Sequence, residues 1–284
     1  MLVTGAEGQL GSELVKVLSD GYLIIPAGRA DFDITHFEAT RNFIKEAQPD
    51  AIIHTAAFTD VDNCENQQDK AFNVNAVGTK NVAIVAKEID VRLFYISTDY
   101  VFDGTKEDPY LETDKPNPVN AYGKSKLLGE NFVKEQLHKF FIIRTAWLYG
   151  LGGKNFVKTM LNLARRGKQL QVVDDQRGTP TYAVDLARQI KKLLPLTSYG
   201  TYHCVSQGNC TWYEFALEIF KSPNTRDLKP ITIRPVTSEE FSRPAKRPKN
   251  SVLKNHMLKL QGLDIMPPWE ESLREFMTTI RRNQ

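Results

Sequence analysis

Short apolar runs alternate with longer amphipathic stretches through the first half of this 284-residue chain. The apolar runs are LVT, YLII, AIIH, RLFYIS and FFIIRT, and they are rich in β-branched or aromatic residues. Such runs predict strands, whereas the stretches between them carry apolar residues at helical spacing. The alternation therefore predicts βαβ units, with a parallel sheet and helices on both of its faces.

Besides a helix that follows the glycines at the start of the chain, three more helices are expected in this half. The first runs from Thr35 to Ala47, where Thr35 and Glu38 have the spacing of a capping box. The others run from about Phe72 to Glu88 and from about Tyr122 to Gln136. Between the fourth apolar run and the last of these helices, Asp103 to Asn120 carries glycine and prolines among charges, which predicts a long surface loop.

After about Gly150 the alternation becomes irregular. Helices are expected at Asn155 to Arg166, Ala183 to Lys192, Trp212 to Phe220 and Trp269 to Arg282, and the segment RPAKRPKN interrupts the pattern before the last of them. We expect an α/β fold with a Rossmann-type, doubly wound parallel sheet. Its nucleotide-binding domain would comprise residues 1–150, completed by part of 170–205. Residues 151–284 would form most of a smaller, partly interleaved C-terminal domain that binds substrate.

Composition narrows the class of protein. The formal net charge is only +3 and the basic residues are scattered, which argues against nucleic acid or an anionic membrane as a partner. Cys64, Cys204 and Cys210 lack metal-ligand spacing, so we expect reduced thiols and assign no metal. No apolar run reaches the roughly 18 residues of a membrane span, and no signal peptide is evident. A cytoplasmic protein is expected.

The opening GAEGQLG places glycines at Gly5, Gly8 and Gly11, after an apolar run and before a helix with an apolar face. Glycines let the backbone approach a pyrophosphate, and the helix N-terminus offers free N–H groups to it. The spacing differs from the general G-x-G-x-x-G fingerprint, so a purely structural turn remains an alternative.

The second apolar run ends near PAGR, where many dinucleotide folds carry an acidic residue for the ribose 2′-hydroxyl. Arg29 stands there instead, with Asp31 and Asp33 beyond it. A guanidinium could bind a 2′-phosphate, which favours NADP(H) over NAD(H). The alternative is that Arg29 is a solvated surface residue.

Tyr122 and Lys126 in YGKSK lie four residues apart and so share one helix face. A nearby ammonium would lower the pKa of the tyrosine, making it a proton donor to a carbonyl that receives a hydride. The stretch STDYVF comes at the end of the fourth predicted strand, so Ser97 or Thr98 could hydrogen-bond the same carbonyl.

The stretches GAEGQLG, NVNAVGT, STDYVF and YGKSK together resemble the extended short-chain dehydrogenase/reductase superfamily. Over nearly the whole chain, TAAFTDVDNCE, RTAWLYG, NFVKTM, DDQRGTPTY, GTYHCVSQG and RPKNS resemble the dTDP-4-dehydrorhamnose reductase family. The resemblance implies an NAD(P)H-dependent oxidoreductase of dTDP-rhamnose biosynthesis. It would reduce the C4 keto group of dTDP-4-dehydro-L-rhamnose to dTDP-L-rhamnose, with NADPH as cofactor and NADH as an alternative.

The resemblance also implies roles for single residues. Thr98, Tyr122 and Lys126 match the family's catalytic residues, and Thr98 and Trp147 its substrate-binding ones, although Trp147 could equally be core. With the glycine pattern, the expected cofactor-binding residues are Gly5, Gly8, Gln9, Leu10, Gly11, Arg29, Asp33, Ile34, Ala56, Ala57, Thr59, Tyr122 and Lys126. Asn75 resembles a family helix asparagine, with a helix-bending contact as its alternative. Arg247 is a candidate for the substrate diphosphate, or a surface charge.

Other functions stay open from the sequence. A catalytically silent relative, the regulatory subunit of methionine adenosyltransferase, shares the fold, and so do sugar-nucleotide epimerases and dehydratases. A dehydratase should show an acidic pair beside the catalytic hydroxyl, whereas STDY supplies only Asp99.

A homodimer is left open, as is a divalent ion near Glu13. The first strand, Met1 to Thr4, is short for the family and could pair weakly.

Overall fold

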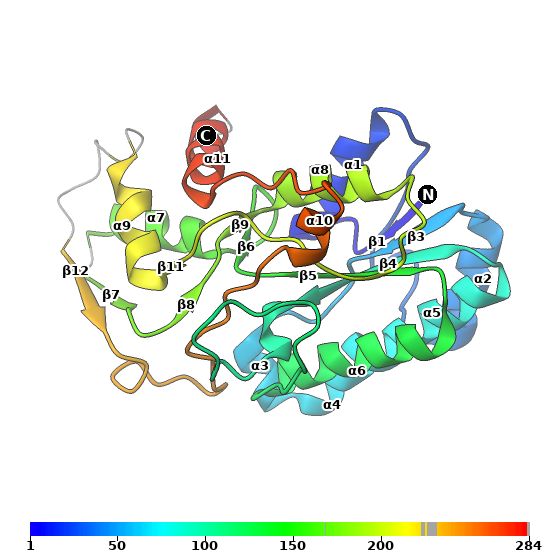
Figure 1. Cartoon of the computed structure of the whole chain (residues 1–284), viewed down its shortest axis with the longest axis horizontal. Helices are drawn as coiled ribbons and strands as arrows, with labels where there is room; N and C mark the ends of the chain where they lie inside the picture. The colour runs from blue at the N-terminus through cyan, green and yellow to red at the C-terminus, as the bar shows by residue number, and fades with distance from the viewer. Residues whose placement is uncertain (168, 223–224, 226–231, 283–284) are drawn as a thin grey trace.

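The computed structural model describes residues 1–167, 169–222, 225 and 232–282. Its largest feature is a six-stranded parallel sheet in the order β10-β5-β4-β3-β1-β2 (Figure 1). The strands are β1 (Leu2–Thr4), β2 (Ile25–Ala27), β3 (Ala51–His54), β4 (Arg92–Thr98), β5 (Phe140–Thr145) and β10 (Gly200–His203). The predicted α/β fold with a doubly wound parallel sheet is confirmed.

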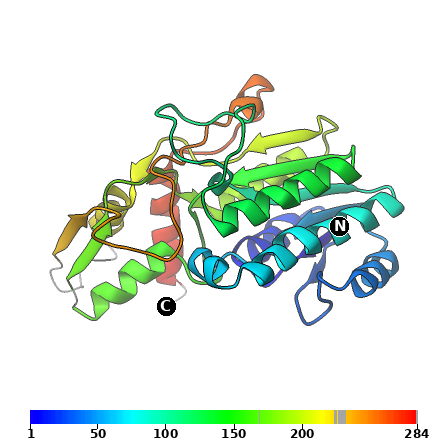
Figure 2. The ribbon, with the colours of Figure 1, turned by 90° about the horizontal axis from the view of Figure 1, so that it is seen from below.

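Helices cover both faces of this sheet, as Figures 1 and 2 show. One layer contains α1 (Gln9–Ser19) and α8 (Ala183–Leu193), and the other contains α2 (Phe37–Ala47), α5 (Thr79–Glu88) and α6 (Ala121–Gln136). Successive strand residues divide between the two layers: Val3 and Ile53 pack toward α1 and α8, whereas Leu2 and Ile52 pack toward α2 and α5. This division follows from the two-residue period of a strand, and it makes the strands apolar on both sides.

The short β1 is well held. It pairs in parallel with β2 on one side and with β3 on the other, and Leu2 and Val3 are completely buried. The Met1 ammonium adds a hydrogen bond of 2.7 Å to the carbonyl of Leu23. Three residues thus suffice here because both neighbours supply ladder bonds.

The helix expected from Phe72 to Glu88 is divided. The chain forms α4 (Gln68–Phe72), a π-helical turn (Asn73–Gly78) and then α5. The Asn75 side chain accepts from the Phe58 N–H at 2.7 Å, and donates to the Phe58 carbonyl at 2.9 Å and to Ser125 Oγ at 3.0 Å. Asn75 therefore joins the loop after β3 to α6, and the wide turn accompanies that contact.

The capping box expected at Thr35 and Glu38 is wrong. The N-cap of α2 is His36, which makes no side-chain cap bond. The Thr35 N–H and hydroxyl donate instead to Asp33 Oδ1, at 2.9 and 2.8 Å. Aspartate readily binds the backbone two residues ahead, and this local turn displaces the cap.

The second strand begins later than expected, since β2 spans Ile25–Ala27 whereas the apolar run YLII begins at Tyr22.

The loop from Asp103 to Asn120 forms no helix or strand, but it is less superficial than expected. Tyr110 is buried, its ring stacks on Phe102 at 4.2 Å, and it forms an isolated bridge with Leu253. The Tyr110 hydroxyl donates to Asp103 at 2.8 Å. An aromatic anchor therefore holds the middle of the loop against the molecule.

The second half builds a smaller unit beside the sheet (Figures 1 and 2). Its elements are α7 (Phe156–Arg165), α9 (Trp212–Lys221), α11 (Trp269–Arg282) and the short pairs β6 (Leu148–Tyr149) with β9 (Thr181–Tyr182), β7 (Leu170–Val173) with β12 (Ile233–Val236), and β8 (Arg177–Gly178) with β11 (Cys210–Thr211). The core of this unit contains Tyr149, Tyr182, Phe215 and Phe276. The helices expected in this half form within a few residues of their predicted ends. The division at residue 150 stays a prediction, although α8 and β10 do return to the main sheet.

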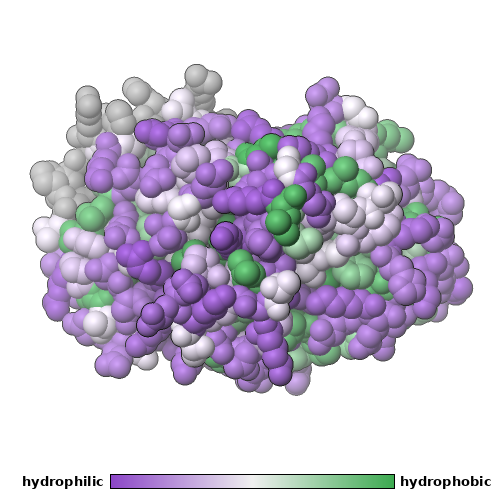
Figure 3. All heavy atoms as spheres, in the orientation of Figure 1, coloured by the Kyte–Doolittle hydropathy of each residue, from purple (hydrophilic) through white to green (hydrophobic). Residues whose placement is uncertain are grey.

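Figure 3 shows a mostly hydrophilic surface on one face, with a small apolar area around α10 (His256–Leu260). Leu260 and Ile265 are 67% and 47% exposed.

The three cysteines are free and buried. Among the described residues, no helix has the length and apolarity that crossing a membrane requires. The homodimer stays a prediction.

Candidate active site

The glycine-rich turn between β1 and α1 packs tightly against the sheet. Gly5 has a φ of +65°, and a Cβ there would lie 2.7 Å from the backbone nitrogen of Ala56. A Cβ at Gly11 would lie 2.2 Å from the Gly5 carbonyl oxygen. Gly8 is the N-cap of α1, and the first turn of that helix has no acidic residue. The turn therefore presents helix N–H groups with little side-chain cover, as a bound pyrophosphate requires.

A cavity of about 590 Å³ lies beside this turn, at the carboxyl ends of β1, β2 and β3. The predicted cofactor-binding residues that line it are Gly5, Gly8, Arg29, Asp33, Ile34, Ala56 and Ala57. At its edge the Arg29 side chain is 83% exposed, with Nη2 3.7 Å from Asp33 Oδ2. Small residues on the walls and a guanidinium at the edge fit the adenosine half of a phosphorylated dinucleotide.

Other predicted cofactor residues hold the turn in place. Gln9 Nε2 donates to the Leu148 carbonyl at 2.7 Å, and Gln9 Oε1 accepts from Asn155 at 3.1 Å. Leu10 is buried in the core beneath α1, whereas Thr59 is exposed beyond β3. The Gln9 and Leu10 side chains therefore connect the turn to its surroundings rather than line the cavity.

Thr98 and Tyr122 meet at the carboxyl end of β4. Thr98 ends that strand, and its hydroxyl donates to Asp99 Oδ1 at 3.0 Å. Tyr122 lies in the first turn of α6, whose N-cap Asn120 accepts a backbone hydrogen bond at 2.8 Å. The side chains of Tyr122 and Thr98 lie near each other. The predicted hydroxyl and the predicted phenol thus lie together.

The electrostatics of Tyr122 differ from the expectation. Burial raises its pKa above the ordinary value, and the neighbouring Thr98 hydroxyl opposes this rise. The sequence led us to expect that Lys126 would lower this pKa. Lys126 Nζ instead lies 4.2 Å from the centroid of the Tyr95 ring, a cation–π contact. Tyr122 therefore keeps its proton at neutral pH, as a proton donor must.

Lys126 is almost fully buried, and burial lowers its pKa to about 7, although Glu130 acts in the opposite direction. The Glu130 carboxylate accepts two hydrogen bonds from Arg144, at 2.9 and 2.7 Å, and one from Ser97 Oγ at 2.6 Å. Ser97, the sequence alternative to Thr98, is thus committed to this buried network. Thr98 is the hydroxyl that faces Tyr122.

Trp147 follows β5, in which Thr145 is the register partner of Thr98. Its φ of 44° is uncommon for a residue with a Cβ. The indole stacks on Trp212, with centroids 3.5 Å apart and planes 7° apart, and a Cβ at Gly178 would lie 2.3 Å from it. The ring is partly buried and held in one orientation. It packs against two core clusters while keeping an exposed part, so both predicted roles remain compatible with its place.

Arg247 lies beside this set and forms a long-range ion pair. Its Nη1 donates to Asp62 Oδ1 at 2.9 Å, on α3 (Val61–Asn66), and the Tyr100 side chain lies near the same guanidinium. The rings of Tyr100 and Tyr122 are in edge contact, with centroids 6.0 Å apart. The sequence identified Arg247 as a candidate but gave no signal for Asp62, since no local spacing marks a contact between such distant residues.

Glu13 is buried on α1, and its carboxylate lies 3.3 Å from Lys16 Nζ. In the part of the chain that the structure describes, no three histidine, cysteine, aspartate or glutamate side chains gather closely enough to hold a metal ion. A divalent ion near Glu13 therefore stays untested.

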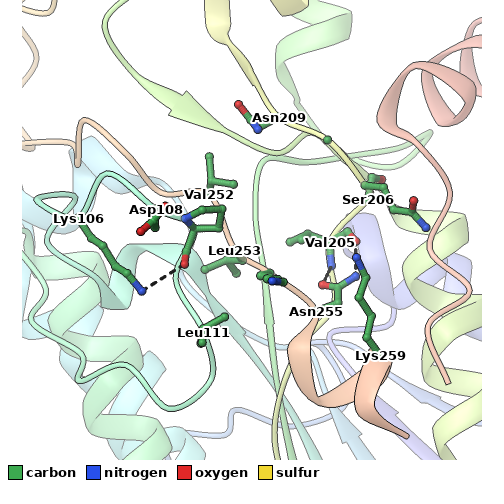
Figure 4. A pocket seen from close by; sticks show the side chains of 14 residues that line it. Lys106, Asp108, Leu111, Val205, Ser206, Asn209, Val252, Leu253, Asn255 and Lys259 are labelled. Atoms are coloured by element: carbon green, nitrogen blue, oxygen red, sulfur yellow. Dashed lines mark hydrogen bonds between the residues drawn. The ribbon is translucent and has the colours of Figure 1, made fainter. Parts of the chain in front are cut away.

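A further cavity of about 470 Å³ lies between the Asp103 to Asn120 loop and the segment after β10. Figure 4 shows Lys106 and Leu111 on one side of it, and Asn255 and Lys259 on the other. The predicted catalytic and cofactor residues do not line this cavity. It is thus separate from the set around Thr98 and Tyr122.

The chain is similar to known proteins over nearly its whole length. Residues 1–282 match the family described as RmlD substrate binding domain. The spore coat polysaccharide biosynthesis protein SpsK of Bacillus subtilis is 42% identical over 279 residues, which cover 98% of this chain and 96% of that protein.

Solved structures give the same result. The structure of a dTDP-4-dehydrorhamnose reductase from Clostridium acetobutylicum is 50% identical, with a TM-score of 0.94 and 99% of each chain covered. That of a dTDP-4-dehydrorhamnose reductase from Bacillus anthracis, in complex with NADP, is 44% identical, with a TM-score of 0.94 and 98% of each chain covered. The resemblance seen in the sequence motifs is confirmed, and the chain belongs to the dTDP-4-dehydrorhamnose reductase family.

Proposed function

We propose that this chain reduces the C4 keto group of dTDP-4-dehydro-L-rhamnose with NADPH and forms dTDP-L-rhamnose. The observation that carries the proposal is the placement of Thr98 beside Tyr122 at the carboxyl edge of the sheet, with Lys126 buried one helical turn further. In an open α/β sheet this edge is where ligands bind. The choice of substrate follows the names of the similar reductases described above, and the choice of cofactor follows the NADP complex of the Bacillus anthracis enzyme.

The chain's own residues would perform the proton chemistry. Bound NADPH supplies the hydride that reaches the carbonyl carbon. Tyr122 gives its hydroxyl proton to the carbonyl oxygen, so that a secondary alcohol forms, and Thr98 hydrogen-bonds the same oxygen. Lys126 lies over Tyr95 before the reaction, and in its protonated form it would offset the charge of the phenolate only once Tyr122 has given up its proton. Solvent then returns the proton to Tyr122.

Trp147 and Arg247 would hold the rest of the substrate. The fixed indole of Trp147 offers a flat apolar wall to the sugar ring, and the Arg247 guanidinium can form charge-assisted hydrogen bonds to the diphosphate. Asp62 keeps Arg247 oriented at the edge of the site before substrate arrives. Binding energy from the distant nucleotide then helps to position the ketone.

NADPH consumption is the direct test, with dTDP-4-dehydrorhamnose generated in the assay by an epimerase. Turnover that needs both the sugar and NADPH supports the proposal, and chromatography with mass spectrometry should identify dTDP-L-rhamnose as product. NADPH binding without turnover would reject the reductase and favour the catalytically silent, regulatory-subunit alternative. The dehydratase alternative has less support, because Asp99 is followed by Tyr100 where a second acid would be needed.

A further inference from the structure

The Glu7 carboxylate lies directly against Gly28, beside the cofactor cavity. Ala6 donates to the Ala27 carbonyl at 3.1 Å, which fixes the glycine-rich turn to the end of β2. A Cβ at Gly28 would lie 2.9 Å from Glu7 Cδ and 3.1 and 3.2 Å from its two carboxylate oxygens. Glu7 therefore occupies the space that a side chain after β2 would otherwise fill.

The position after β2 is where dinucleotide-binding folds often recognise the ribose of the cofactor. In many dinucleotide folds an acidic residue near the end of the second strand accepts a hydrogen bond from the adenosine ribose 2′-hydroxyl. Here the strand ends at Ala27, and Gly28 carries no side chain. Glu7 thus brings a carboxylate to this position from the glycine-rich turn.

The nearby aspartates are already engaged. Asp31 Oδ2 accepts from the Gly28 N–H at 2.7 Å, and Asp33 Oδ1 accepts twice from Thr35. Within the described residues, no hydrogen bond or ion pair engages the Glu7 carboxylate, which is exposed and lines the cavity. Glu7 is therefore the carboxylate that is free to meet a ribose hydroxyl.

Glu7 and Arg29 line the same cavity with opposite charges. A 2′-phosphate is attracted by the Arg29 guanidinium and repelled by the Glu7 carboxylate, whereas a 2′-hydroxyl can donate to Glu7. We propose that Glu7 determines cofactor specificity: it binds the 2′-hydroxyl of NADH and weakens NADPH binding, so that the chain accepts both cofactors. This inference rests on the proposed function only in assuming that NADPH and NADH bind at this cavity.

The test compares Glu7→Gln and Arg29→Met with the wild type. Glu46→Gln is the matched control, since it removes an exposed carboxylate from α2 that does not line the cavity. Dissociation constants for NADPH and NADH are measured by fluorescence without any sugar, and kcat/KM is measured afterwards. We expect Glu7→Gln to raise the ratio Kd(NADH)/Kd(NADPH) about tenfold, Arg29→Met to lower it about tenfold, and Glu46→Gln to leave it within about twofold, as a partly exposed charge pair allows.

The effect of Glu7→Gln should shrink as salt is added, because exposed charges are screened. An unchanged ratio in Glu7→Gln, or an equal shift in Glu46→Gln, would overturn the inference. Because the ratio comes from binding alone, it remains informative if no ketone is reduced, an outcome that would reject only the proposed function. Failure of both cofactors to bind the wild type would overturn the inference and the proposed function together.

Discussion

Arg247 donates a hydrogen bond of 2.9 Å to the Asp62 carboxylate, and this contact joins the segment before α10 to α3 beside the sheet. Arg243 approaches the same carboxylate at 3.5 Å, but its side chain is 51% exposed, against 19% for Arg247. A less exposed pair is less screened by solvent and more firmly oriented. Of the two arginines, Arg247 is thus the better prepared to receive a diphosphate.

Arg247→Met should raise the KM for the nucleotide sugar by about 10- to 100-fold, because a charged hydrogen-bond donor to the diphosphate is lost. The KM for NADPH should change little. Asp62→Asn should have the same direction with a smaller effect, since Arg247 stays present but less oriented. Steady-state kinetics with Arg243→Met as the control would check this, and an equal loss in that variant would contradict the assignment to Arg247.

Tyr122→Phe should lower kcat by about 10²- to 10⁴-fold, the usual contribution of a positioned proton donor. The Kd for NADPH should stay within about threefold, because the phenyl ring keeps its packing. Thr98→Ala should cost less, and Thr98→Ser should restore much of the activity by returning the hydroxyl. Tyr213→Phe, on α9, controls for the loss of a phenol elsewhere. Full activity in Tyr122→Phe would identify another group as the donor.

The pH profile should reflect Lys126. Its pKa of about 7 means that the protonated form is lost as pH rises above neutrality. If the ammonium is needed, kcat/KM should fall about tenfold per pH unit on that side, because this parameter reports groups of the free enzyme. Lys126→Arg keeps a positive charge throughout, so the descending limb should disappear even if the maximum is lower. An unchanged limb in Lys126→Arg would show that another group titrates.

The pattern of apolar residues predicted the sheet and most helices because buried parallel strands and amphipathic helices have simple periods. Local hydrogen bonds were harder to predict. Asp33 accepts the Thr35 hydrogen bonds in place of the expected capping box, and Asn75 lies in a π-helical turn whose apolar spacing is almost that of an α-helix. Both differences occur where a side chain hydrogen-bonds to the backbone, which hydropathy does not register.

For the site, the motifs identified Thr98 and Tyr122, which do meet. The motifs did not predict that Lys126 lies over the Tyr95 ring or that Glu7 lies against Gly28. These contacts join residues from different strands, helices and turns, so their geometry is set only when the sheet assembles. Burial then sets the pKa of Lys126, and burial cannot be read from a helix motif alone.

Two buried histidines should make the fold sensitive to acid. Burial lowers the pKa of His54 and of His203 to about 3, compared with 6.5 when unfolded. Between these values the unfolded chain binds more protons, so each histidine should weaken the fold by about 1.4 kcal/mol per pH unit as pH falls from 6.5 toward 3. Replacing His203 by Asn should reduce that slope of the unfolding free energy, measured by urea titration at several pH values, whatever its effect at neutral pH. Equal slopes in wild type and His203→Asn would mean that His203 is protonated within the folded protein.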